Sequence, residues 1–378
     1  MNSESKLSLL IPTYDGRYGR LTRTLTYLSE IAVADLIPSG RAAKIEVIIA
    51  DGTDADLKNV ELSKIKFLEA LNTASELLSI SYLELPGMSY FQRVFRLVEA
   101  SSSPYVSLLG DEDLFVFDCI DEIFEIFEEG NVNAVCGRYV DIHGYIRGRL
   151  KMSLHEGWFN EFKIESSSAI ERLKAYLSFC GIGAPPMYFS VNLRDFMLRV
   201  SGLIASQEDK FSFVNEEKFF NYMRLACGSI ISINRPLYLR DMTFIGRGDD
   251  DPIWDRPDLD DEANQLLCES ICSSCDEFSS PAEVVKVFDE AKAFTVTNGG
   301  QLIEMRSLMS AAQPWLSDYL ASSLKPSTLA ACKNAWAKTL DCAYPNTLKS
   351  QLGVPGFWRR RAHQLINLMG SKLHKKNL

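Results

Sequence analysis

Residues 105–113 read YVSLLGDED, a short and mostly apolar run that ends in a glycine and three acidic residues. The run predicts a strand that is buried on both faces. Two similar runs precede it, LSLLI at 7–11 and IEVIIA at 45–50, and polar residues follow both of them closely. Because segments with helical spacing separate the three runs, the sequence predicts an α/β fold with a mostly parallel sheet flanked by helices.

The rest of the chain predicts further strands and helices, followed by an all-helical C-terminal region. The additional strands are expected at 80–85, 132–142, 187–191 and 230–239, and helices at 17–33, 91–98, 119–129 and 211–225. The stretch 246–262 is rich in aspartate, glycine and proline, which predicts an acidic flexible loop or linker. We therefore expect an α/β domain over residues 1–245 and a helical region over 263–378.

The composition excludes several classes of protein. Of the 378 residues, 46% are hydrophobic and 24% are charged, which excludes global disorder. The formal net charge of -10 argues against a nucleic-acid partner, because binding to phosphates needs a basic surface. Nine cysteines, an odd number in a long chain, argue against a secreted disulfide framework. The sequence shows no signal peptide and no apolar stretch of membrane-spanning length, so we expect a cytoplasmic protein.

Three predicted strands end in polar or acidic residues, at Thr13–Asp15, Asp51–Asp54 and Asp111–Asp113. The carboxyl ends of parallel strands lie at the same edge of a sheet, where ligands bind. Asp111 and Asp113 at i and i+2 can hold Mg²⁺ or Mn²⁺, which prefer carboxylate and phosphate oxygens. Such an ion neutralises a diphosphate leaving group. The alternative is a solvated acidic turn.

Other polar residues are candidates for binding a nucleotide at the same edge. Asp51 and Asp54 can accept hydrogen bonds from a base or a ribose, although Asp54 can instead cap a helix. Thr13 and Tyr14 offer a backbone contact and a stacking face. Arg93 can pair with a phosphate, or it can be solvated on its helix.

Four motifs in this order resemble those of GT-A-fold glycosyltransferases of the family 2 type. They are IPTYDGR at 11–17, IIADGTD at 48–54, LLGDED at 108–113 and VNEEKFF at 214–220. The resemblance is to the bacterial members that build cell-surface polysaccharides, and it covers about residues 5–242. It implies a nucleotide-sugar-binding catalytic domain with a D-x-D motif, and an inverting, metal-dependent transfer. The implied donor is a UDP-sugar, and the implied acceptor is a hydroxyl of a surface glycan or a lipid-linked glycan.

The resemblance also implies roles for individual residues. Glu217 corresponds to the catalytic base, with Glu216 as its neighbour. The implied metal ligands for Mn²⁺ or Mg²⁺ are Asp113 and Asp111, and Asp241 is expected as a third. The expected nucleotide-sugar-binding residues are Thr13, Tyr14, Asp15, Arg17, Asp51, Asp54, Arg93, Asp111 and Glu112.

The sequence departs from the family pattern at two places. The acidic pair is Glu216-Glu217 where the family often has Glu-Asp, so either glutamate can be the base. An alternative role for both is a favourable helix first turn. The family often has a histidine after the next strand, whereas this chain has Asp241, which can substitute as an oxygen ligand.

Two features lie outside these motifs. Residues 356–378 carry six Lys or Arg and no acid, which predicts a basic amphipathic segment. It can contact the inner face of the cell membrane, pack on the acidic body or be disordered. Cys268, Cys272 and Cys275 have a spacing known from iron–sulfur enzymes, but helix-packing cysteines are favoured.

Two other functions are compatible with the sequence. One is a sugar-phosphate nucleotidyltransferase on a related sheet. The other is an inactive transferase-like scaffold for polysaccharide assembly.

Overall fold

A computed structural model gives the structure of residues 5–14, 17–53, 61–130, 132–146, 149–154, 163–180, 189–211, 213–241, 261–290 and 320–343. The described strands are β1 (Leu7–Thr13), β2 (Ile45–Asp51), β3 (Ser79–Glu84), β4 (Tyr105–Leu108), β5 (Leu114–Phe115), β6 (Val132–Ile146), β7 (Arg149–Leu154), β8 (Lys163–Ile164), β9 (Val191–Leu193) and β10 (Ser229–Asp241). The described helices include α1 (Tyr18–Ile31), α2 (Glu61–Ser75), α3 (Tyr90–Ala100), α4 (Ile120–Glu128), α5 (Ala169–Cys180), α6 (Arg194–Ser206), α7 (Phe213–Cys227), α8 (Asp261–Ser274) and α11 (Pro326–Ala343).

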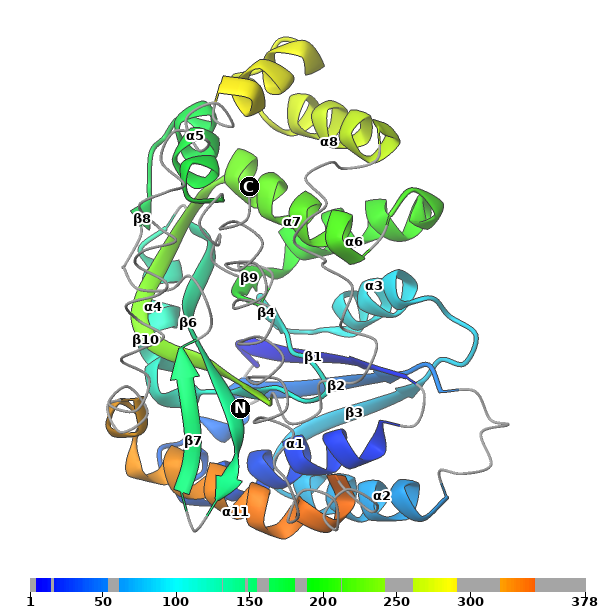
Figure 1. Cartoon of the computed structure of the whole chain (residues 1–378), viewed down its shortest axis with the longest axis vertical. Helices are drawn as coiled ribbons and strands as arrows, with labels where there is room; N and C mark the ends of the chain where they lie inside the picture. The colour runs from blue at the N-terminus through cyan, green and yellow to red at the C-terminus, as the bar shows by residue number, and fades with distance from the viewer. Residues whose placement is uncertain are drawn as a thin grey trace, which may run out of the picture.

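The strands form one sheet in the order β3-β2-β1-β4-β9-β6-β10-β5, with β7 on β6 and β8 on β10 (Figure 1). β3, β2, β1 and β4 pair in parallel. β9 is antiparallel to both β4 and β6, and β10 is parallel to β6. β6 and β10 therefore run in the same direction as β1, and the predicted α/β fold with a mostly parallel sheet is confirmed.

Both faces of the sheet are buried, as the apolar strands predict. In β1, Leu9 and Ile11 belong to the core on one face, whereas Leu10 belongs to the core on the other. α1, α2 and α11 cover the first face, and α3, α6 and α7 cover the second (Figure 1). This alternation follows from the two-residue repeat of a strand, which sends successive side chains to opposite faces.

The helices of the C-terminal region pack on the α/β region. α8 contacts α7, and α11 lies along α1 with Trp336 in the same core. The start of α11 is fixed by Asp118, whose carboxylate accepts a hydrogen bond from the Lys325 N–H at 2.6 Å and another from Thr328. Most of the predicted acidic linker and the whole basic segment 356–378 lie outside the described residues. Within the described helices, none is long and apolar enough to span a bilayer.

Candidate active site

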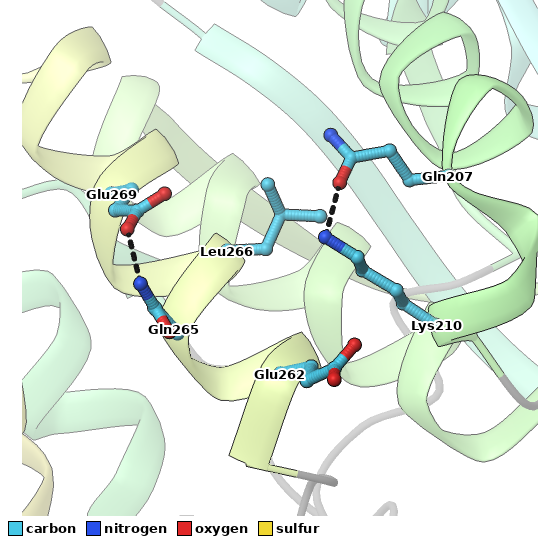
Figure 2. Close-up of a pocket in the computed structure, with 6 residues that line it drawn as sticks. All are labelled: Gln207, Lys210, Glu262, Gln265, Leu266 and Glu269. Atoms are coloured by element: carbon cyan, nitrogen blue, oxygen red, sulfur yellow. Dashed lines mark hydrogen bonds between the residues drawn. The ribbon is translucent and has the colours of Figure 1, made fainter.

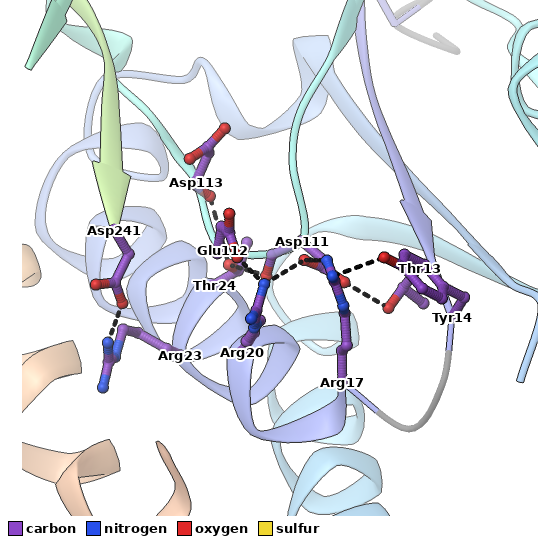
Figure 3. A network of polar contacts seen from close by, with 10 residues as sticks. All are labelled: Thr13, Tyr14, Arg17, Arg20, Arg23, Thr24, Asp111, Glu112, Asp113 and Asp241. Carbon is purple, nitrogen blue, oxygen red and sulfur yellow. Dashed lines mark hydrogen bonds and ion pairs between the residues drawn. The ribbon is translucent and has the colours of Figure 1, made fainter. Parts of the chain in front are cut away.

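The carboxyl ends of β1 and β4 bring three predicted site residues into contact (Figure 3). Thr13 Oγ1 donates a hydrogen bond to Asp111 Oδ2 at 2.8 Å, and Arg17 Nη1 lies 3.4 Å from Asp111 Oδ1. Asp111 is buried, and burial raises its pKa although the two arginines nearest to it, Arg17 and Arg20, act in the opposite direction. The predicted convergence of strand ends therefore exists for this part of the edge.

Asp113 has an unusual environment for a carboxylate. Its side chain is only 3% exposed, and its Oδ1 has no hydrogen-bond partner among the described residues. Burial, together with the charges of Asp111, Asp241 and Asp141, raises its pKa to about 7, while Arg240 acts against the rise. The alternative of a solvated acidic turn does not fit these buried carboxylates. A buried, unpaired carboxylate oxygen is the kind of atom that binds a hard cation.

Tyr14 lies near two of the predicted arginines. The guanidinium carbons of Arg17 and Arg93 lie 4.2 Å and 5.7 Å from the centroid of its ring, and Arg17 Nη2 donates to the Tyr14 hydroxyl at 2.7 Å. Arg93 is buried rather than solvated, and its Nη1 donates to the Met88 carbonyl at 2.8 Å. A Cβ on Gly52 would lie 1.9 Å from Arg93 Nη1, so glycine is needed for this close approach.

Three arginines at the N-cap and in the first turns of α1 each meet a carboxylate. They are Arg17, Arg20 and Arg23, spaced three residues apart along the helix. Arg20 pairs with Glu112, and Arg23 pairs with Asp241 (Figure 3). Arg20 and Arg23 were not predicted as site residues, although their spacing from Arg17 places them on the side of the helix that Arg17 begins.

Asp241 lies at the carboxyl end of β10, at the same sheet edge, and is buried with Arg23. Arg23 is 1% exposed and also contacts α11: its Nε donates to Thr339 Oγ1 at 3.0 Å, and its guanidinium lies 4.6 Å from the Trp336 ring. Asp241 Oδ2 is paired with Arg23, so this oxygen would have to leave the ion pair to bind a metal ion. Among the described residues, no three His, Cys, Asp or Glu side chains form a group that could hold a metal ion. The role of Asp241 as a ligand stays a prediction.

Asp51 ends β2, and its carboxylate is surrounded by donors. Tyr18 and Tyr82 donate their hydroxyls to Oδ2 at 3.0 Å and 2.6 Å, and the Thr53 N–H donates to Oδ1 at 2.8 Å. The two tyrosines were not expected from the sequence, because only the fold brings them to the strand end. Asp15 and Asp54, also predicted here, lie outside the described residues.

Both glutamates of the acidic pair lie near the start of α7. Glu216 is 1% exposed, whereas Glu217 is half-buried. Burial raises the pKa of the hydroxyl of Tyr139 in β6, and the charges of Asp113 and Glu217 raise it further. The charges of Asp113 and Glu217 therefore both act on one buried phenol, which was not predicted as part of the site.

Two other features do not belong to this edge. A cavity of about 330 Å³ is lined by none of the predicted site residues (Figure 2), its lining being Gln207, Lys210, Glu262, Gln265, Leu266 and Glu269. Cys268, Cys272 and Cys275 lie in or directly after α8 and belong to or pack against the apolar core, which fits helix-packing cysteines.

No protein-family model matches the chain, and no curated protein matches it. Among solved structures, it resembles the crystal structure of S. aureus TarS 1–349 at 12% sequence identity and a TM-score of 0.48, over 92% of this chain and 91% of that chain. The complex of TarS 1–349 with UDP-GlcNAc gives 13% identity and a TM-score of 0.47, over 89% of this chain and 81% of that chain. Identities and scores this low assign neither a family nor an activity, which must be inferred from the site.

Proposed function

We propose that this protein is an inverting, divalent-cation-dependent glycosyltransferase. It transfers a sugar from a nucleoside diphosphate, with UDP as the expected nucleotide, to a hydroxyl of a bacterial surface glycan or a lipid-linked acceptor. The observation that supports this proposal is the buried Asp113 carboxylate, whose Oδ1 has no hydrogen-bond partner among the described residues. Asp113 is suited to binding a cation, and Glu217 is suited to accepting a proton.

Asp113 and Asp111 are the residues that would hold Mn²⁺ or Mg²⁺. Asp113 fits a hard cation because it offers a buried oxygen without a donor, whereas the Asp111 oxygens already contact Thr13 and Arg17. A bound cation would supply charge neutralisation for the departing diphosphate. Arg17 and Arg93 both lie near the Tyr14 ring and are the candidates to pair with the same phosphates.

Glu217 is assigned as the base that accepts the proton of the acceptor hydroxyl. The hydroxyl oxygen forms a bond to the anomeric carbon while the bond from that carbon to the diphosphate oxygen breaks on the opposite side, which inverts the configuration. Glu217 is preferred over Glu216 because it is half-buried, whereas Glu216 is almost fully buried. General-base assistance of this kind contributes about 10²–10⁴ in rate.

The test is release of UDP from UDP-sugars by the purified full chain with Mn²⁺ and a glycan acceptor. Asp113→Ala should abolish release. The matched control is Glu99→Gln, which removes an exposed acid on α3 and should leave release unchanged. Full turnover by Asp113→Ala would contradict the proposed role of Asp113.

The same preparation separates the other two functions. Release of pyrophosphate from a nucleoside triphosphate and a sugar phosphate would favour the nucleotidyltransferase. Failure to bind any nucleotide, together with capture of polysaccharide-assembly proteins, would favour the inactive scaffold. Neither function has a specific observation in its favour at this site.

A further inference from the structure

Most of the hydrogen-bond acceptor positions of the Asp51 carboxylate are occupied by described residues of the protein itself. It is 3% exposed, and three donors among the described residues contact it: two tyrosine hydroxyls on Oδ2 and the Thr53 N–H on Oδ1. An ionised carboxylate has about four acceptor positions in total. Within the part of the chain that the structure describes, one position therefore remains, and it belongs to Oδ1.

The two tyrosines come from different elements and are held rigidly. Tyr18 is the first residue of α1, and Tyr82 lies in β3 opposite Ile49 of β2. Phe67 of α2 packs against both rings, with centroid distances of 5.2 Å to Tyr18 and 5.3 Å to Tyr82. Burial and the Asp51 charge raise the pKa of both hydroxyls, so both remain protonated donors at neutral pH.

We infer that Tyr18 and Tyr82 are positioning residues that restrict Asp51 to a single hydrogen bond from the base of the donor nucleotide. The inference rests on the proposed function. Both tyrosine hydroxyls hold Oδ2, so the carboxylate cannot offer both oxygens to a ligand. A base with one N–H between two carbonyls, the uracil type, matches this single acceptor.

Other bases match it less well. Guanine presents neighbouring N–H groups on its ring and its amino group, which are best satisfied by both oxygens of one carboxylate. Cytosine presents an unprotonated ring nitrogen at the corresponding position, which repels a carboxylate. Removing one tyrosine hydroxyl frees Oδ2, so the carboxylate can turn and accept the second donor of guanine. The tyrosines should therefore set the preference between bases and not merely the affinity.

The test is calorimetric titration of the full chain with UDP and with GDP. Wild type should prefer UDP, and Tyr82→Phe should reduce the ratio of UDP to GDP affinity by about tenfold, the scale of one hydrogen bond to a charged group. Tyr18→Phe should act in the same direction. The matched control is Tyr105→Phe, which changes a tyrosine that stacks on Phe127 at 4.4 Å, at the opposite end of its strand from the candidate site.

A purely structural role would weaken UDP and GDP equally and leave the ratio unchanged. An unchanged ratio in both Tyr82→Phe and Tyr18→Phe, with binding retained, would overturn the inference while leaving the proposed function intact. A wild-type chain that binds neither nucleotide would instead refute the proposed function. Tyr82 is only half-buried, so Tyr82→Phe should fold even where Tyr18→Phe does not.

Discussion

Replacing Asp113 by asparagine should change how the stability of the protein depends on pH. The pKa of this carboxyl is about 7 in the folded protein, against 3.8 in an unfolded chain. The folded state therefore binds the proton more tightly, and stability is lost as the pH rises from the lower value to the higher one. At 1.36 kcal/mol per pKa unit, the full cost above neutral pH is about 4 kcal/mol. The asparagine side chain carries no charge, so Asp113→Asn should escape this cost.

The assay is urea unfolding of wild type and Asp113→Asn in chelator, near pH 5 and near pH 8. Burying the asparagine amide has its own cost, which does not depend on pH. The informative quantity is therefore how the difference in free energy of unfolding between the two proteins changes with pH. That difference should move in favour of Asp113→Asn by about 2.5 kcal/mol between the two pH values. The control is Asp195→Asn, which removes a carboxylate that is 98% exposed and should leave the unfolding curves unchanged.

Adding Mn²⁺ provides the second half of the experiment. At an ion concentration about a hundred times its Kd, wild type near pH 8 should gain about 2.7 kcal/mol, and Asp113→Asn should gain much less. A difference between the two proteins that does not vary with pH would refute the electrostatic reasoning. Equal stabilisation of both proteins by Mn²⁺ would refute the placement of the cation at Asp113.

Three further substitutions address neighbouring parts of the site. A Cβ on Gly110 would lie 2.7 Å from Asp113 Oδ2, so Gly110→Ala should displace that carboxylate and weaken Mn²⁺ affinity, measured by calorimetry, with little change in the thermal midpoint. Gly52→Ala should push the Arg93 guanidinium away from its place, which we expect to raise the KM for the nucleotide sugar more than it lowers kcat. Glu217→Gln should lower kcat by about 10²–10⁴ while nucleotide binding is retained, and an unchanged kcat would exclude Glu217 as the base.

The sequence predicted the sheet and its acidic edge because both depend on local patterns. Apolar runs closed by polar residues identify buried parallel strands. The carboxyl ends of such strands lie at the same edge of the sheet, whatever the positions of the helices. Asp111 and Asp113 were placed correctly at this edge for that reason. Their role as metal ligands stays a prediction.

The partners of these residues could not be predicted in the same way. Tyr18, Tyr82 and Tyr139 reach the edge only through strand pairing and helix packing, which no local pattern encodes. The pairing of Asp241 with Arg23 is a similar case, since 218 positions separate the two residues in sequence. Predicting it would have required knowing how α1 packs against the end of β10.

The contacts of Arg23 also constrain how the protein is made. Its hydrogen-bond partner Thr339 follows it by 316 positions, which a ribosome adding 5–20 residues per second needs roughly 15–60 s to reach. Throughout that interval the nascent chain carries a cation without its final burial site, and the apolar side of α1 lacks its covering helix. Shortened expression products that stop before α11 should therefore be recovered mainly in inclusion bodies. Chaperone-rich hosts should raise the yield of the complete chain.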